Sequence, residues 1–92
     1  MGTNPRVRPQ RLAEKLRHIR MSLDLTQAEL LRQLELEGLA TQSKISEFES
    51  GRRDPSLLIL LQYARAAGVH MEDLVDDNTD LPAKLPARRT RR

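Results

Sequence analysis

The chain has 92 residues, a formal net charge of +3, two histidines and no cysteine. This length suits one small domain with a modest core, and the absence of cysteine excludes disulfides and thiolate metal sites and favours a reducing, cytoplasmic setting. No apolar run approaches the roughly 20 residues of a membrane-spanning helix, and His18 and His70 have no partner at ligand spacing, so we expect no membrane contact, metal or cofactor.

Basic residues gather at the two ends of the chain. Residues 1 to 11 contain three arginines and no acid, and residues 76 to 92 contain five basic residues against three acids. Since the whole chain carries +3, residues 12 to 75 carry −2. A polyanionic partner would therefore be attracted by local patches and tails, and not by the net charge of the central domain.

Residues 1 to 8 are predicted to form a flexible basic arm, because Pro5 and Pro9 interrupt a short polar run. A first helix is predicted from about Pro9, a residue suited to a first turn, to about Ser22. It has an apolar stripe at positions i, i+4 and i+7 that must pack on other elements, formed by Leu12, Leu16 and Ile19.

A second helix is predicted to begin at a capping box, Thr26-Gln27-Ala28-Glu29, in which hydroxyl and carboxylate each accept a backbone N–H of the other residue. It is predicted to run to about Glu37 and to stop at Gly38, with three leucines inward: Leu30, Leu31 and Leu34. Thr41 can then cap a third helix that Gly51 ends. Two short helices joined by a tight turn predict a helix-turn-helix.

The third helix has an apolar side, with Ile45 and Phe48, and a polar side. The polar side carries Ser43, Ser46, Glu47 and Ser50, with Gln42 and Lys44 on the flanks. Short side chains let a helix approach a crowded surface, and Gln and Ser are among the residues that read base edges in the DNA major groove. A solvated helix whose serines have no role explains this stretch equally well.

Ser56 can cap a fourth helix, from Leu57 to about Ala67, which Gly68 ends. Its predicted core face consists of Leu57, Leu60, Leu61 and Ala64. A second apolar strip, predicted to face outward, consists of Ile59, Tyr63 and Ala66. We interpret this strip as a dimer contact, the alternative being an isoleucine that is exposed without a role.

A short fifth helix is predicted at about Met71 to Val75. Residues 77 to 92 are predicted to form an extended tail, because Pro82 and Pro86 prevent a continuous helix. The tail ends in a basic run, Arg88 to Arg92, for which phosphate contact and docking of a partner protein are the two functional readings.

Several of these motifs, in this order, resemble the repressor-like (XRE-type) helix-turn-helix family, typified by phage repressors and Cro proteins. The resemblance covers about residues 11 to 75. It rests on Leu25-Thr26-Gln27-Ala28-Glu29-Leu30, on Gln42-Ser43-Lys44-Ile45-Ser46-Glu47-Phe48-Glu49-Ser50-Gly51-Arg52, on Pro55-Ser56-Leu57, and on Ala64, Gly68-Val69 and Leu74. It implies an all-α, five-helix, lambda-repressor-like DNA-binding domain at residues 9 to 76.

The resemblance also implies roles for individual residues. Base contacts are expected from Gln42, Ser43, Ser46 and Glu47. Phosphate contacts are expected from Thr26, Gln27, Lys44, Ser50, Gly51, Arg52 and Arg53. A structural ion pair beneath the recognition helix is expected between Arg20 and Glu49.

The chain departs from the family pattern at two places. About four residues are added between Leu34 and Thr41, most simply as one more turn of the second helix and a longer connector. The other departure is Glu47, because a carboxylate that faces phosphates is repelled unless it accepts from a cytosine amino group or pairs with Lys44 or Arg52.

The leading hypothesis is a sequence-specific transcriptional regulator that binds double-stranded DNA as a homodimer through the major groove, on half-sites about one helical turn apart. The alternative is an antitoxin or adaptor whose residues 78 to 92 bind a partner protein. An enzyme is not expected, because the sequence lacks a nucleophile with a base, a glycine-rich phosphate loop and a plausible pair of carboxylates.

Overall fold

The computed structural model describes residues 9 to 86, which contain five helices and no strand. The helices are α1 (Leu12–Ser22), α2 (Gln27–Gln33), α3 (Gln42–Ser50), α4 (Leu57–Ala67) and α5 (Met71–Val75). The predicted all-α architecture is therefore confirmed. None of these helices is long and apolar enough to cross a membrane. The predicted arm at residues 1 to 8 and the basic run at Arg88 to Arg92 lie outside the described residues.

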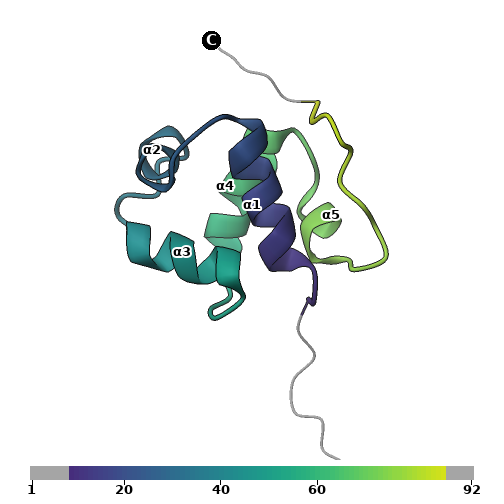
Figure 1. The fold of residues 1–92 in the computed structure, drawn as a ribbon, viewed down its shortest axis with the longest axis horizontal. Helices are drawn as coiled ribbons and strands as arrows, with labels where there is room; N and C mark the ends of the chain where they lie inside the picture. Colours follow the sequence, from purple (N-terminus) through teal and green to yellow (C-terminus); the bar gives the residue numbers. More distant parts are fainter. Residues whose placement is uncertain (1–8, 87–92) are drawn as a thin grey trace, which may run out of the picture.

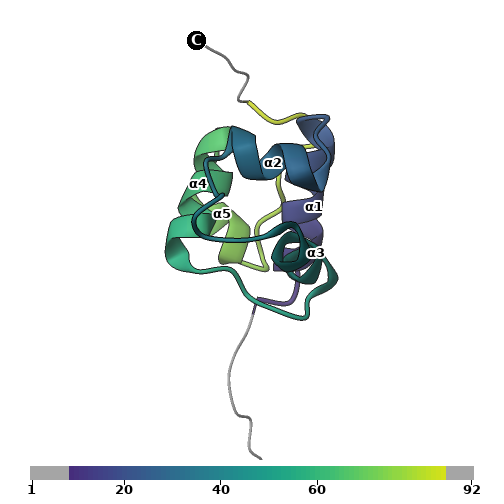
Figure 2. The same cartoon turned by 90° about the vertical axis from the view of Figure 1, so that its left-hand side faces the viewer.

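The first helix, α1, lies at the centre of the fold and contacts α3, α4 and α5, while α2 packs on α3 (Figure 1). Figure 2 looks along α3, with α2 crossing above it and α4 on the other side of the molecule. In both views α3 lies at the periphery, so one side of it is buried and the other faces away from the domain.

The core collects apolar side chains from every helix and from the turn between α2 and α3. The α1 stripe of Leu12, Leu16 and Ile19 is buried as predicted. From α3, Ile45 and Phe48 enter the same core. Burying one such side chain contributes about 1.5 to 3 kcal/mol. The nine-residue α3 is too short to persist alone and is therefore held by these two anchors.

The second helix ends at Gln33, four residues before the predicted end at Glu37. Glu35 adopts the left-handed conformation, with φ 56°, and the Leu36 N–H donates to the Leu31 carbonyl at 2.8 Å, which closes the helix end. A non-glycine residue in this conformation costs roughly 1 to 2 kcal/mol. The turn nevertheless forms because it delivers Leu36 to full burial in the core. The added residues therefore form a turn that is largely exposed but buries Leu36, and the predicted extra turn of α2 and stop at Gly38 are wrong.

The α4 helix has the predicted cap, with the Ser56 hydroxyl accepting from the Ile59 N–H, and the predicted end at Gly68. Its buried face differs from the predicted one. Ile59 and Tyr63 are buried within the chain's own core, whereas Leu57 and Leu58 are 74% and 59% exposed. Buried positions on α4 follow the helical period and comprise Ile59, Leu60, Tyr63, Ala64 and Ala67.

The predicted dimer contact through Ile59, Tyr63 and Ala66 is therefore wrong as an outward-facing strip. Ile59 and Tyr63 are covered by the rest of the same chain, and Ala66 is partly buried against that core. Within residues 9 to 86 the Tyr63 hydroxyl meets no hydrogen-bonding partner. Burial, followed by the nearby Glu49 carboxylate, raises the pKa of this phenol.

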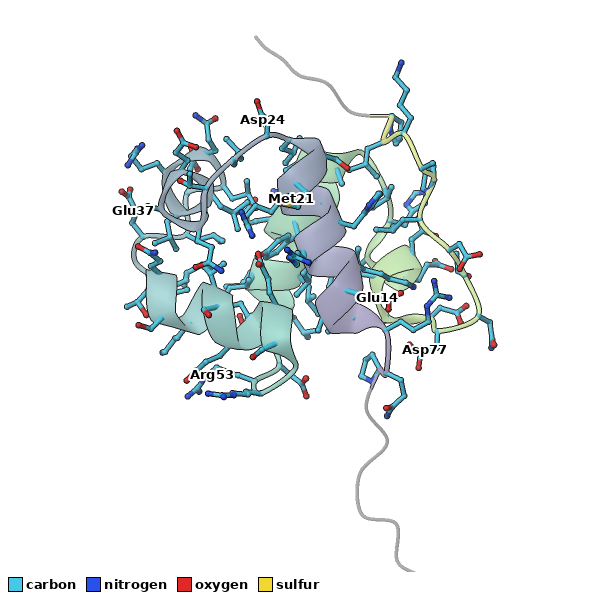
Figure 3. The ribbon with its side chains drawn as sticks, viewed as in Figure 1. Glu14, Met21, Asp24, Glu37, Arg53 and Asp77 are labelled. Atoms are coloured by element: carbon cyan, nitrogen blue, oxygen red, sulfur yellow. The ribbon has the colours of Figure 1, made fainter. Side chains whose placement is uncertain are left out.

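The first helix begins at Leu12 rather than near Pro9, because a distant carboxylate supplies its cap. Asp77 accepts the backbone N–H groups of Gln10 at 2.8 Å and Arg11 at 3.0 Å. Figure 3 shows Asp77 beside the start of α1. A negative charge is favourable at this end of a helix, so the segment after α5 helps to fix where α1 starts.

Residues 77 to 86 contain no helix and run along α1 (Figure 1). The His18 imidazole lies 3.3 Å from the Pro82 carbonyl, and Arg11 forms an ion pair with Asp80. Leu81 and Leu85 are partly buried against the core. The leucines of this segment are thus occupied by contacts within the chain.

Replacing Asp77 with asparagine is expected to lower the melting temperature Tm at neutral pH. The Gln10 and Arg11 N–H groups, followed by the charges of Lys15 and Arg11, lower the pKa of Asp77 from its usual 3.8. Because the folded state has the lower pKa, this stabilisation is fully present above the unfolded pKa and is lost as the pH falls through the folded pKa. Thermal melts by circular dichroism should therefore give a Tm difference that is largest at neutral pH and disappears in acid.

Glu72→Gln is the matched control for this experiment, because Glu72 is an exposed carboxylate on the neighbouring α5. Its Tm should stay close to that of the wild type at every pH. A Tm difference for Asp77→Asn that persists unchanged in acid would contradict the capping role.

Candidate nucleic-acid interface

The helix-turn-helix begins at the predicted capping box. The Thr26 hydroxyl accepts from the Glu29 N–H at 3.1 Å, and the Glu29 carboxylate accepts from the Thr26 N–H at 2.8 Å. The bond from the Thr26 backbone lowers the pKa of Glu29. Both contacts lie at the molecular surface, so they fix the start of α2 without burying it.

The third helix has the predicted bounds. The Thr41 hydroxyl accepts from the Lys44 N–H at 3.2 Å, and Gly51 ends the helix with φ 83°. The left-handed turn lets the Arg52 N–H donate to the Glu47 carbonyl at 3.0 Å. Glycine suits this position because other residues lack its freedom at positive φ.

The outward side of α3 carries the residues that the sequence assigned to base contact. Gln42, Ser43 and Ser46 are exposed, and Glu47 is partly exposed. Their side chains are short or uncharged except for Glu47, so the α3 backbone can approach another surface closely. A helix with such a face fits the width of the DNA major groove.

An ion pair supports α3 from below. The Arg20 guanidinium on α1 donates to both carboxylate oxygens of Glu49, at 2.7 and 3.0 Å, and to the Leu25 carbonyl at 2.9 Å. The side chains are 12% and 6% exposed, and the bond to Glu49 raises the pKa of Arg20. This bidentate ion pair fixes α3 against α1 more firmly than a single hydrogen bond would.

Gln27 joins the same network from the start of α2. Its side-chain amide is partly buried and donates to the Glu49 carboxylate at 3.4 Å. Through Gln27, Glu49 and Arg20, the first three helices therefore meet at one carboxylate, which sets the position of α3 relative to α2.

The residues assigned to phosphate contact lie around α3. Thr26 and Gln27 are at the start of α2, Lys44 is exposed on the first turn of α3, and the remaining four follow at its end: Ser50, Gly51, Arg52 and Arg53. The Ser50 hydroxyl donates to the Glu47 carbonyl at 3.1 Å. Figure 3 shows Arg53 beneath α3, on the side of the helix that faces away from the domain.

The partner of Glu47 differs from the two cations that the sequence suggested. Its carboxylate accepts from the Arg53 Nε at 2.6 Å, and not from Lys44 or Arg52. The left-handed turn at Gly51 folds the chain back toward α3 and brings Arg53 within reach. Sequence spacing gives no signal for this pair, because the contact depends on the shape of the turn.

A surface cavity of about 370 Å³ lies between α1 and the C-terminal segment and not beside α3. Of its charged lining residues, Arg11 pairs with both Glu14 and Asp80, and Lys15 donates to the backbone carbonyls of Asp73 and Asp76. In the part of the chain that the structure describes, no three His, Asp or Glu side chains form a group that could hold a metal ion. The exposed side of α3 is therefore the best candidate site.

In a comparison with protein families, residues 11 to 77 match the model of a helix-turn-helix domain. Neither the search of curated proteins nor the search of solved structures found a match. The matched range includes all five helices and ends at the residue that caps α1. The family match confirms the resemblance drawn from the motifs: the chain belongs to the family of helix-turn-helix domains, a family of XRE-like DNA-binding domains.

Proposed function

We propose that this chain is a transcriptional regulator that binds a specific double-stranded DNA sequence by inserting α3 into the major groove. The observation that carries the proposal is the exposed polar face of α3, anchored from below by Ile45, Phe48 and the Arg20–Glu49 pair. A helix that is fixed on one side and presents short polar groups on the other can read base edges without rearranging.

Gln42 is the principal base-reading residue in this proposal. It is exposed at the first position of α3, and the N-terminal residues of a recognition helix contact base edges. Its amide can both accept from and donate to one adenine. Ser43 and Ser46 add single hydrogen bonds, while Arg52 and Arg53, next to the end of α3, supply cations for the flanking phosphates.

We also propose that two copies act together on DNA. The nine residues of α3 span roughly 14 Å, about four base pairs. So short a site recurs too often in a genome to be selective. A dimer on two half-sites about one helical turn apart would provide the missing specificity, and the stoichiometry on a selected duplex tests this.

Gln42→Ala is expected to weaken binding to the selected site by about 1 to 3 kcal/mol and to leave nonspecific binding almost unchanged. Arg52→Ala should weaken binding to both kinds of DNA, because a phosphate contact carries no sequence information. The measurement is a titration of a duplex selected from a randomised pool, and of an unrelated duplex, at two salt concentrations.

Equal losses on both duplexes for Gln42→Ala would contradict its role in base reading. Gln62→Ala is the matched control. Gln62 lies in the middle of α4, so this substitution removes the same amide group from a different helix. It should leave both affinities unchanged. Wild-type protein that binds no duplex at either salt concentration would contradict the proposed function as a whole.

The alternative, an antitoxin or adaptor that binds a partner through residues 78 to 92, has weaker support. Leu81 and Leu85 are the apolar residues that such a segment would offer, and both pack against this chain's own core. A partner would have to displace them, together with the Arg11–Asp80 ion pair.

A further inference from the structure

Glu47 is the carboxylate that α3 directs outward, since Glu49 is turned inward to Arg20. On a surface that approaches DNA, an unpaired carboxylate is repelled by the phosphates. Simple electrostatics therefore predicts that removing Glu47 tightens binding to every DNA sequence. The contacts of this carboxylate point to the opposite result.

The carboxylate of Glu47 binds the Arg53 guanidinium through its Nε–H group alone. Its Oε1 atom lies 2.6 Å from the Arg53 Nε, and the side chains are 36% and 51% exposed. The bond uses only the Nε–H of the guanidinium. Within residues 9 to 86, the two terminal amino groups of Arg53 make no hydrogen bond. Those amino groups are the fork that binds phosphate oxygens.

The backbone of Glu47 organises the same end of α3. Its carbonyl accepts from the Arg52 N–H at 3.0 Å and from the Ser50 hydroxyl at 3.1 Å. One residue thus fixes, through its backbone, the turn that carries Arg53 and, through its side chain, the direction of the Arg53 guanidinium. An arginine held in advance loses less side-chain entropy when it meets a phosphate.

We propose that Glu47 is a positioning residue for a DNA phosphate contact made by Arg53, and not a base-reading residue. The inference rests on the proposed DNA-binding function. In the free protein the pair has no net charge, so the carboxylate adds little long-range repulsion, and it orients the guanidinium with both terminal amino groups directed to the phosphate.

A double-mutant cycle on DNA binding tests the inference, with Glu47→Ala, Glu47→Gln, Arg53→Ala and the double variant Glu47→Ala/Arg53→Ala. We expect Glu47→Ala and Arg53→Ala each to weaken binding by about three- to tenfold on all duplexes alike. The double variant should be no weaker than Arg53→Ala alone. Glu47→Gln keeps an acceptor oxygen and should lie between Glu47→Ala and the wild type.

Glu37→Ala is the matched control, because Glu37 is an exposed carboxylate on the turn before α3 (Figure 3). It removes the same charge without touching Arg53, and its affinity should equal or slightly exceed that of the wild type. Both Glu47 and Arg53 are partly exposed, so circular dichroism should report folded proteins for every variant in the cycle.

Three results would overturn the positioning role. They are tighter or unchanged binding by Glu47→Ala on all duplexes, a Glu47→Ala loss of affinity confined to one C·G base pair, and additive losses of affinity in the double variant.

The Glu47–Arg53 pair can also be detected by NMR in the absence of DNA. The Arg53 Nε–H resonance should be slow to exchange in the wild type and fast in Glu47→Ala, and fast exchange in both would contradict the pair. Wild-type protein that binds no duplex would instead remove the proposed function on which the inference rests.

Discussion

Replacing Glu49 with alanine is expected to destabilise the domain by about 3 to 5 kcal/mol and to abolish DNA binding. The substitution leaves the Arg20 guanidinium, only 12% exposed, without its carboxylate, and the Gln27 amide loses its acceptor as well. A small domain has a total stability of roughly 5 to 15 kcal/mol. The loss is therefore a large share of the total stability. Because Glu49 lies on α3, the substitution removes the contact that holds α3 against α1.

Urea denaturation measures this loss as a lower midpoint with an unchanged m-value. Glu49→Gln keeps one acceptor oxygen for the Arg20 guanidinium and should be less destabilising than Glu49→Ala. Arg20→Met/Glu49→Leu removes both charges and should recover much of the stability, because two apolar side chains of similar volume can replace a buried pair. A loss below about 1 kcal/mol for Glu49→Ala would mean that the pair adds little to the fold.

The starts of α2, α3 and α4 could be predicted because their signals are local. Thr26, Thr41 and Ser56 each bond to a backbone N–H three residues ahead, so a few residues of sequence contain the whole interaction. The ends of α3 and α4 could be predicted equally well from the glycine at each end, and Gly51 and Gly68 both adopt positive φ.

The end of α2 could not be read in the same way. A glutamate in the left-handed conformation has no sequence signature, and Glu35 adopts it because Leu36 must reach the core. The buried face of α4 was ambiguous for a related reason. Leu57 to Leu61 are five consecutive apolar residues, so the periodicity leaves the register open and only the packing against α1 and α5 decides it.

The candidate site was predictable where it depends on α3 alone. With two apolar anchors, Ile45 and Phe48, the helix has one orientation that buries both and leaves Gln42, Ser43 and Ser46 outside. The Glu47–Arg53 pair depends on the turn beyond the helix, and it was missed. The assignment of individual side chains to bases or phosphates stays a prediction until binding is measured.

Replacing Lys15 with methionine is expected to destabilise the domain by about 3 kcal/mol. Lys15 lies in the apolar stripe of α1 and is only 2% exposed. Its ammonium group donates to the Asp73 and Asp76 carbonyls, both at 2.8 Å, at the C-terminal end of α5. A cation is favourable at this end of a helix, and its hydrogen bonds satisfy carbonyls that a five-residue helix leaves unpaired.

Methionine keeps the apolar stem of lysine and removes the ammonium group, so the expected loss isolates the two charged hydrogen bonds. Hydrogen exchange should show α5 and residues 77 to 86 opening before α1 and α3, because Lys15 ties the C-terminal part of the fold to the centre. Lys84→Met is the control, since Lys84 is exposed, and it should change the stability by less than about 0.5 kcal/mol. Equal stability of the Lys15 and Lys84 variants would mean that packing alone holds α5 on α1.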